Sequence, residues 1–240
     1  LSRNGVMNEG VISTKMGLSG IPSEAETIMV HRDIALARMT GGILHLAHLS
    51  VAESVDMVRE AKRKMDNLTC EVAIHHLVLT EEDVTGYNAN AKVSPPLRTK
   101  KDISALIKGL KDGTIDCIVT DHAPHTEEEK GAGFDSAPFG MIGFETAFSL
   151  ALELQEKGLT LMQIIAFFTT GPARILNMDR GSIKEGSQAD MVIFDPEREW
   201  VYRKEEIRSK SKNSPFIGRK MKGRVLTTIY KGRVVFSLEG

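Results

Sequence analysis

The sequence predicts an α/β fold with a parallel sheet, and three observations support this prediction. Short apolar runs alternate with helix-periodic segments between residues 23 and 120, which is typical of βα units. Histidine and aspartate follow the ends of these runs, where parallel α/β folds place their active sites. From Gly181 onward, short β-rich runs are separated by glycine and charged residues. We therefore expect an α/β domain over residues 1–180 and part of a small β domain over residues 181–240.

The elements of the α/β part are predicted from local signals. Capping boxes pair Ser50 with Glu53 and Thr99 with Asp102 at the starts of two helices. The prolines of the Ser94–Leu97 segment fix an extended backbone. We expect helices at 23–39, 51–61 and 99–110, strands at 43–49, 68–74 and 115–120, and a polar loop at 80–90.

The second half of the chain carries helical patterns and then strand patterns. Helices are expected at 142–156 and 161–176, followed by strands at 190–195, 224–230 and 233–237. The Tyr230–Arg233 segment is typical of a hairpin turn. Residues 126–136 contain three consecutive glutamates, two glycines and few apolar residues, so we expect a mobile, solvent-facing loop.

The composition excludes several classes of protein. A net charge of -1 gives no argument for nucleic acid or an anionic membrane surface as a partner, and no apolar run reaches the ~18 residues that span a bilayer. Cys70 and Cys117 lie in separate strand-like runs, which argues against a disulfide and for a reducing compartment such as the cytoplasm. The chain starts at Leu1 without methionine or a signal peptide, so we expect a fragment or a processed chain.

Two strand ends carry residues that suit a metal ion. His48 follows one strand and Asp121 follows another, and imidazole nitrogen and carboxylate oxygen are both zinc ligands. The alternative is a hydrogen-bonded core histidine and a turn aspartate. His75 and His76 end a third strand, where alternation lets at most one of them face a given site. His45 falls on the opposite strand face from His48, which indicates a structural role.

Five segments, in this order, resemble dihydroorotases of the bacterial long-chain type, in the cyclic amidohydrolase superfamily. They are LAHLS, KVSPPLR, TDHAPH, APFGMIGFETAF and NSPFIGRKMKGRV, and together they span nearly the whole chain. DHAPH followed by APFG is specific to this resemblance. PPLR alone is shared with hydantoinases and allantoinases.

The resemblance implies a fold and a reaction. The fold would be the last strands and helices of a (β/α)₈ TIM-type barrel, followed by part of a small composite β domain. The reaction would be the reversible closure of N-carbamoyl-L-aspartate to dihydroorotate in pyrimidine synthesis. The cofactor would be one or two Zn²⁺ ions. The expected partner is this small-molecule substrate, together with either further copies of the chain or another enzyme of pyrimidine synthesis.

The resemblance also implies roles for individual residues. His48 matches a metal ligand, and Asp121 matches a metal ligand that also transfers the proton. His125 matches a residue that holds the substrate carboxylate. The backbone groups of Phe139 and Gly140 match positions that meet the pyrimidine ring.

The chain departs from the family pattern in two ways. Ser94 replaces the asparagine that contacts substrate, and Ile74 replaces a proline before the histidine pair. The paired histidines of the first barrel strand, the bridging carboxylate and the Arg and Asn that clamp the substrate have no counterpart here, so the remaining ligands are expected upstream of Leu1. We therefore expect these 240 residues alone to be inactive. A hydantoinase-type or allantoinase-type enzyme, or a non-catalytic structural partner of another pyrimidine enzyme, stays an alternative.

Overall fold

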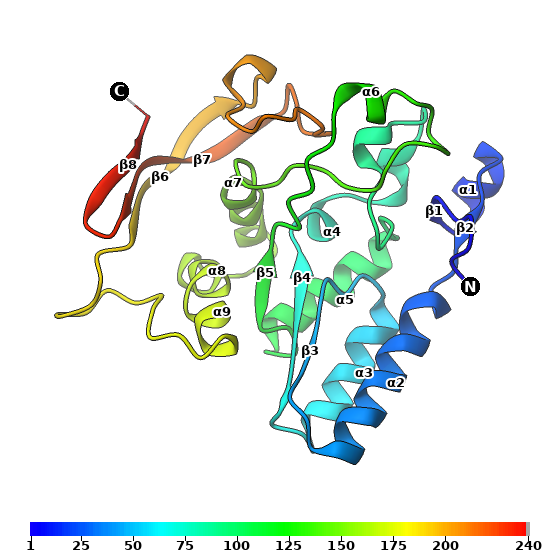
Figure 1. The fold of residues 1–240 in the computed structure, drawn as a ribbon, viewed down its shortest axis with the longest axis horizontal. Helices are drawn as coiled ribbons and strands as arrows, with labels where there is room; N and C mark the ends of the chain where they lie inside the picture. The colour runs from blue at the N-terminus through cyan, green and yellow to red at the C-terminus, as the bar shows by residue number, and fades with distance from the viewer. Residues whose placement is uncertain (239–240) are drawn as a thin grey trace. The chain divides into compact units, whose positions relative to one another are not determined.

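The computed structural model describes residues 1–238 and contains two compact units (Figure 1). The first, which we name the sheet unit, comprises Leu1–Phe144 and Arg208–Pro215. The second, the hairpin unit, comprises Glu145–Ile207 and the described chain from Phe216 onward. These units are defined by contacts and do not test the domain boundary predicted at residue 181, which stays a prediction.

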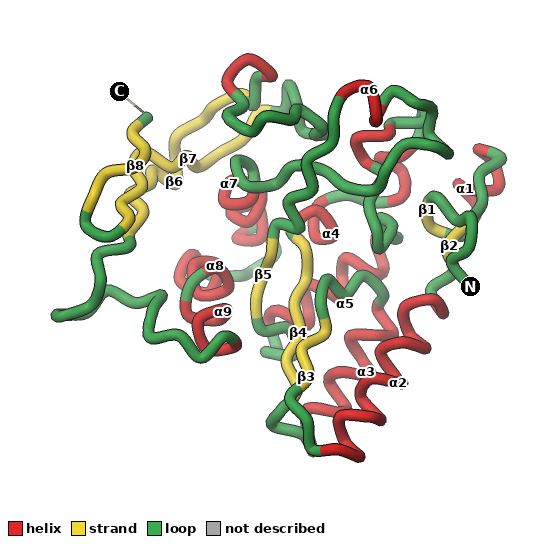
Figure 2. Tube along the Cα trace, viewed as in Figure 1, coloured by secondary structure: helices red, strands yellow, loops and turns green. Residues whose placement is uncertain are grey.

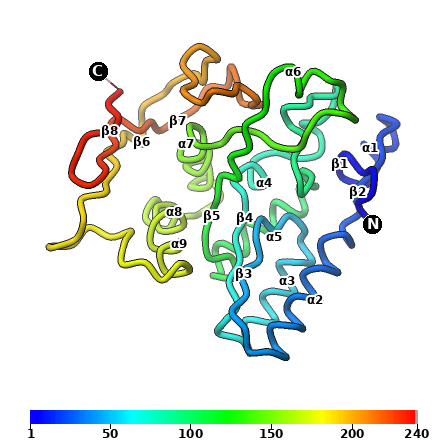
Figure 3. Tube along the Cα trace, in the orientation of Figure 1, coloured from blue at the N-terminus to red at the C-terminus, as the bar shows by residue number. Residues whose placement is uncertain are grey.

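A three-stranded parallel sheet forms the centre of the sheet unit. Its strands are β3 (Leu44–Leu46), β4 (Leu68–Ala73) and β5 (Cys117–Val119), in that spatial order and with the same direction along the trace of Figure 3. Helices α2 (Glu24–Thr40), α3 (Ala52–Lys62) and α5 (Lys100–Lys111) lie on one side of it in Figure 1. The predicted mixed α/β architecture with parallel βα units is confirmed, and the strands are shorter than expected.

The helices of the sheet unit begin with different caps. Helix α5 has the predicted capping box of Thr99 and Asp102. The box predicted for α3 is wrong, because Val51 occupies the N-cap position and Ser50 instead contacts Glu26. The N–H of Ala52, which has no acceptor within its own helix α3, donates to Asp102 Oδ1 at 2.9 Å. A single carboxylate therefore caps two helices.

Short elements connect these helices and strands. The N-terminal segment pairs β1 (Met7–Asn8) with β2 (Gly20–Ile21) around helix α1 (Val11–Met16). Helix α4 (His75–Val78) follows β4 directly. The polar loop contains two 3₁₀ turns, η1 (Glu81–Val84) and η2 (Ala89–Ala91).

The segment predicted to be a mobile loop packs more than its composition indicates. It forms helix α6 (Glu127–Lys130), and both Lys130 and Phe134 are buried. Phe134 makes an edge-on contact with the ring of Tyr87, and the Lys130 ammonium is bonded to backbone carbonyls. The expectation of a solvent-facing segment is confirmed for its other residues, which are exposed, and the expectation that it lacks the means to pack is wrong at Lys130 and Phe134.

The hairpin unit combines helices with an antiparallel sheet, as the colours of Figure 2 show. Its helices are α7 (Ala147–Leu152), η3 (Glu153–Gln155), α8 (Leu161–Phe168) and α9 (Thr170–Ile175), and its sheet is β6 (Met191–Val201), β7 (Lys220–Tyr230) and β8 (Arg233–Ser237), with η4 (Lys204–Glu206) after β6. The predicted hairpin turn is confirmed: Lys231 and Gly232 both have positive φ, which suits a two-residue turn.

Two predicted helices of the hairpin unit are shorter or broken. The helix expected at 142–156 covers Ala147–Leu152 and continues only as a 3₁₀ turn. The helix expected at 161–176 is interrupted at Thr169, where φ is -126°. Pro172 explains the break, because its ring excludes a helical carbonyl four residues earlier and it has no N–H.

Helix α7 packs against strand β7 at a glycine. The Ser149 hydroxyl and the Trp200 indole N–H both donate to Gly223 O, at 2.6 and 3.0 Å. Gly223 has a φ of 84°, and a Cβ there would lie 2.1 Å from Leu152 Cδ1, so a larger residue would strain the backbone and displace the end of the Leu152 side chain. No helix in the described range 1–238 is long and apolar enough to cross a membrane.

Candidate functional site

His48 and Asp121 occupy equivalent places beyond the C-terminal ends of two strands of the parallel sheet. Each lies two residues beyond the end of its strand, β3 for His48 and β5 for Asp121. Both also have a left-handed backbone, with φ of 38° and 46°. For residues other than glycine this conformation costs about 1–3 kcal/mol and is concentrated at functional sites. Asn4, Tyr87, Asn177 and Lys231 share this conformation, so it agrees with the choice of His48 and Asp121 without singling them out.

A carboxylate clamp holds the chain just after His48. The N–H groups of Ser50 and Val51 donate to Glu26 at 3.0 Å, and the Ser50 hydroxyl bonds the same carboxylate. On the other side, Leu49 N–H donates to Glu71 O of strand β4 at 3.0 Å. The three residues that follow His48 are thus held by Glu26 and by strand β4.

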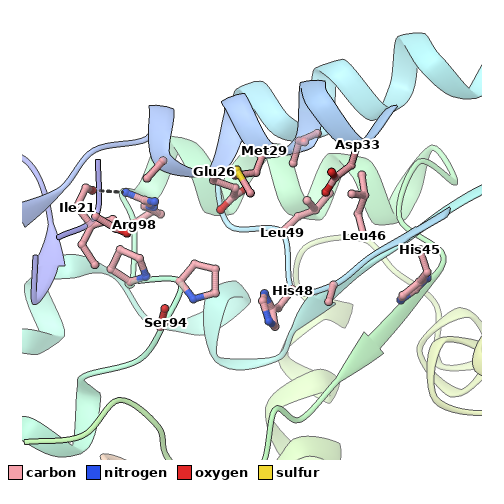
Figure 4. A pocket seen from close by; sticks show the side chains of 16 residues that line it. Ile21, Glu26, Met29, Asp33, His45, Leu46, His48, Leu49, Ser94 and Arg98 are labelled. Atoms are coloured by element: carbon pink, nitrogen blue, oxygen red, sulfur yellow. Dashed lines mark hydrogen bonds between the residues drawn. The ribbon is translucent and has the colours of Figure 1, made fainter. Parts of the chain in front are cut away.

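A pocket in the sheet unit, lined by His48 and the Ser94–Pro96 segment on one side, has a volume of about 380 Å³. Figure 4 shows Glu26, Met29 and Asp33 of helix α2 on its other side. The structure therefore brings His48 and Ser94 to one cavity. Asp121 shares the sheet edge with His48 but does not line this cavity.

The arginine of the PPLR motif is structural in this arrangement. Arg98 is buried, and its guanidinium donates to Ser50 Oγ at 3.2 Å, Asn8 Oδ1 at 2.7 Å and Ile21 O at 2.8 Å. Burial lowers its pKa, and the nearby Glu26 carboxylate opposes that shift. Arg98 therefore connects the N-terminal segment to the chain around His48. The sequence indicated the PPLR motif without giving Arg98 a role, and no sequence signal indicated Glu26.

His75 and His76 lie in helix α4 and not in a strand, which corrects the prediction that they face opposite ways. Their rings are 4.4 Å apart and both side chains are buried. His76 Nε2 donates to Pro95 O at 2.9 Å, which fixes the segment that carries Ser94. Burial lowers the pKa of His76 to about 4 and that of His75 well below its usual value, so both rings are neutral at physiological pH.

A second group of predicted residues is formed by two neighbouring segments, 122–125 and 139–142. His122 and Met141 form a parallel bridge, and Ala123 N–H donates to Met141 O at 2.9 Å. His125 Nε2 donates to Phe139 O at 2.9 Å. The structure thus brings His125, Phe139 and Gly140 together.

Gly140 is required by the close approach of these segments. Its φ is 131°, and a Cβ there would lie 2.5 Å from Ala123 Cβ and 3.1 Å from His125 Nε2. Its N–H donates to Lys92 O at 2.8 Å. The N–H of Gly140 is therefore already bonded, and its carbonyl, which accepts from the Asn213 amide, keeps a second lone pair.

Two buried lysines support the segment before Phe139. Lys130 Nζ donates to Ala89 O at 2.9 Å and to Pro138 O at 2.8 Å, and burial lowers its pKa to about 8. Lys92 Nζ donates to Phe134 O at 2.7 Å and lies 4.6 Å from the centre of the Phe139 ring. These ammonium groups fix the backbone that leads to Gly140.

The described residues supply an incomplete set of metal ligands. His48 Nδ1 is buried and has no hydrogen-bond partner in the described chain, which suits a ligand nitrogen. However, no group of three His, Cys, Asp or Glu side chains within residues 1–238 is arranged to hold a metal ion. A catalytic zinc usually takes three protein ligands, so His48 and Asp121 alone do not complete a site.

Comparisons with known proteins give one consistent assignment. The model of the amidohydrolase family matches residues 14–235. A dihydroorotase of Endomicrobium trichonymphae is 52% identical over 99% of this chain and 57% of that protein, and one of Thermoanaerobacter sp. (strain X514) is 50% identical over 98% and 55%. The chain thus spans little more than half the length of these curated relatives.

Solved structures agree in fold at lower sequence identity. Dihydropyrimidinase from Brevibacillus agri NCHU1002 superposes with a TM-score of 0.84 at 28% identity, over 90% of this chain and 49% of that one. L-Hydantoinase (dihydropyrimidinase) from Arthrobacter aurescens gives 0.83 at 26% identity, over 97% and 56%.

Proposed function

The chain belongs to the amidohydrolase family, and on this premise we propose that it takes part in the interconversion of N-carbamoyl-L-aspartate and dihydroorotate. One observation carries the proposal: identity to dihydroorotases is 46–52% over nearly the whole chain. Identity to the hydantoinase and dihydropyrimidinase structures is 28% or less. We place the reaction in pyrimidine synthesis and in the cytoplasm, where buried free thiols such as Cys70 and Cys117 stay reduced.

We further propose that the parallel sheet is part of a (β/α)₈ barrel. The order β3-β4-β5, with helices between successive strands, supports this proposal. The placement of His48 and Asp121 also supports it, because barrel enzymes carry their catalytic residues at the C-terminal ends of strands.

Asp121 is the proposed proton-transfer residue. Its carboxylate would take the proton from the attacking water and return it to the leaving nitrogen during ring opening. The left-handed backbone at Asp121, with φ of 46°, turns the chain sharply at the sheet edge. Gly143 packs against this turn, since a Cβ there would lie 2.9 Å from Thr120 O.

His125 is the proposed group that holds the substrate carboxylate. Its Nε2 donates to Phe139 O, so Nδ1 could donate to a substrate carboxylate only in the doubly protonated ring. An acidic group already lies there, with Glu129 Oε2 at 3.5 Å from Nδ1. The carbonyl groups of Phe139 and Gly140 would accept from the ring N–H of the substrate. Ser94, shorter than the family's asparagine, would contact substrate through its backbone.

The amidohydrolase family is generally metal-dependent, and zinc is the ion we propose, with His48 and Asp121 as two of its ligands. Such an ion would supply a nucleophile at neutral pH and polarise the amide carbonyl. The other ligands would come from parts of the protein beyond these 240 residues, because the described part lacks a group of three donors. The same reasoning predicts that the 240 residues alone do not turn over substrate.

A chimera tests this proposal. The 240 residues would replace the matching 57% of the Endomicrobium trichonymphae dihydroorotase, and the chimera and the isolated chain would be assayed with N-carbamoyl-L-aspartate, hydantoin and allantoin. We expect turnover of the first substrate by the chimera alone, reduced at least ~100-fold by Asp121→Asn. Preference for hydantoin or allantoin would reject the assigned substrate, and turnover by the isolated chain would reject the ligand count.

Two alternatives have support from particular observations. The fold similarity to hydantoinases, with TM-scores of 0.83–0.84, favours a related cyclic amidohydrolase, although the sequence identity fits it less well. The two-donor metal set favours a non-catalytic partner of another pyrimidine enzyme. A chimera that folds and stays inactive towards all three substrates would favour the second alternative. We leave self-association or such a complex as proposals for its assembly.

A further inference from the structure

We propose that Asn213 is a positioning residue that fixes the two segments carrying His125 and Gly140 against each other. The inference deepens the proposed function, because it assigns the support of the substrate-binding group, and it rests on that function for its meaning. Asn213 belongs to the short stretch Arg208–Pro215 that returns to the sheet unit. It is 88 positions from His125 in the sequence and is buried.

The Asn213 side chain bonds both segments at once. Its Nδ2 donates to Ala123 O at 2.9 Å and to Gly140 O at 3.2 Å. Its Oδ1 accepts from the backbone N–H of His125 at 3.1 Å. The side-chain amide therefore connects segments 122–125 and 139–142 through the backbone groups of Ala123, His125 and Gly140, as a peptide group does between paired strands.

The backbone of Asn213 adds a third connection. Its carbonyl accepts from Ile142 N–H at 3.0 Å, so the residue holds segment 139–142 at two points. Both amide hydrogens and the amide oxygen of the side chain are used, and the residue is 3% exposed. A buried amide with all these bonds made has one orientation, because rotation by half a turn would set oxygen against two carbonyl groups.

The consequence concerns the His125 ring. Its Nε2 bond to Phe139 O exists only while segments 122–125 and 139–142 keep their present register. In addition to the bridge between His122 and Met141, the Asn213 side chain bonds both segments, at Ala123 O and Gly140 O. Loss of Asn213 would free His125 to turn, and Nδ1 would no longer be presented to a carboxylate.

Two substitutions separate positioning from general stability. Asn213→Asp keeps an oxygen for the His125 N–H but sets a carboxylate against the carbonyls of Ala123 and Gly140. Asn213→Leu removes every side-chain bond. The matched control is Asn67→Asp, because Asn67 also donates its amide to a backbone carbonyl, that of Gly42, elsewhere in the sheet unit.

The deciding measurement is NMR of the chimera described above with ¹⁵N-labelled histidine, with His125 assigned by a His125→Gln variant. We expect wild type and Asn67→Asp to show a protonated Nε2 at His125 and a protected His125 amide. Asn213→Asp should lose the Nε2 signature but keep the protected amide, and Asn213→Leu should lose both. An Asn213→Asp protein that keeps the Nε2 signature would overturn the proposal, and so would one that loses protection throughout the chain.

A kinetic arm uses the active chimera. We expect Asn213→Asp to raise KM for N-carbamoyl-L-aspartate at least about tenfold with kcat changed less than about threefold, because tenfold corresponds to about 1.4 kcal/mol, roughly one buried hydrogen bond. Equal KM in the wild-type chimera and its Asn213→Asp variant would overturn the proposal. If the wild-type chimera is inactive, the proposed function fails, and the NMR result still decides the role of Asn213.

Discussion

Removal of the Glu26 carboxylate should release the chain next to His48. Glu26 accepts from the amides of Ser50 and Val51 and from the Ser50 hydroxyl, and Ser50 and Val51 are 0% and 4% exposed. In Glu26→Ala these three donors lose their acceptor inside the protein. A buried donor without a partner costs about 1–3 kcal/mol, and partial hydration of the new space reduces the sum, so we expect a loss of about 3–5 kcal/mol.

Glu26→Gln gives an intermediate result by the same reasoning. The glutamine oxygen still accepts from the two amides at the place of Oε1, while the charge that faces Arg98 is lost. We expect a cost of about 1–2 kcal/mol, because hydrogen bonds to a charged group are stronger than neutral ones. Glu24→Ala is the matched control, since Glu24 lies in the first turn of the same helix and is exposed. Its effect should stay within about 0.5 kcal/mol.

Urea unfolding followed by circular dichroism measures these differences, and hydrogen exchange at Leu49 reports the local effect. Leu49 N–H is bonded to Glu71 O, so its exchange should accelerate in Glu26→Ala if the clamp keeps the His48 turn in place. A cost of Glu26→Ala below about 1 kcal/mol, or equal to that of Glu24→Ala, would refute the reasoning.

Three further perturbations have expected outcomes. The pKa of His76 is about 4 in the folded chain against 6.5 when unfolded, so the unfolded state binds more protons between these two pH values. The contribution of neutral His76 to the free energy of unfolding is therefore complete above about pH 6.5 and falls by about 1.4 kcal/mol per pH unit toward pH 4. Urea unfolding in EDTA at a series of pH values should show that the free energy of unfolding of His76→Gln depends less on pH than that of the wild type. An unchanged pH dependence would contradict this. Gly223→Ala should cost about 2–4 kcal/mol, because its Cβ would lie 2.1 Å from Leu152 Cδ1, whereas Gly186→Ala, with no atom within 4 Å, should cost about 1 kcal/mol; equal melting temperatures would reject the packing argument. Asp102→Ala should cost about 2–3 kcal/mol by removing the caps of two helices, and Asp102→Asn about half of that, in thermal unfolding; a loss under about 0.5 kcal/mol would show that water replaces both caps.

Local signals predicted the elements whose causes are local. The capping box at Thr99 is correct because its two partners are three residues apart. The box at Ser50 is wrong because the residue that bonds Ser50, Glu26, is 24 positions away and no pattern in the sequence shows this pairing. The break at Thr169 had a visible signal in Pro172, which the apolar period of the segment obscured.

Some features of the candidate site also followed from local sequence signals, and others did not. The places of His48 and Asp121 follow from the rule that loops after parallel strands carry functional residues, and the structure puts both at one sheet edge. Their left-handed backbone could not be foreseen, because neither residue type requires it. Lys130 and Asn213, although Asn213 begins the NSPFIGRKMKGRV segment, were given no role because their partners are backbone groups, which every residue has and no sequence pattern reveals.

The outer edge of strand β3 affects how the isolated chain can be handled. Within the described residues, β3 pairs only with β4, so the other side of its backbone presents unpaired N–H and C=O groups. Ile43, immediately before the strand, is 92% exposed, and the one ionisable side chain of Leu44–Leu46, His45, is paired with Glu71 of the neighbouring strand. Such an edge is a template for strand addition between molecules. Samples of the 240 residues should therefore form β-rich aggregates as concentration rises, and dilute, cold solutions should keep them dispersed.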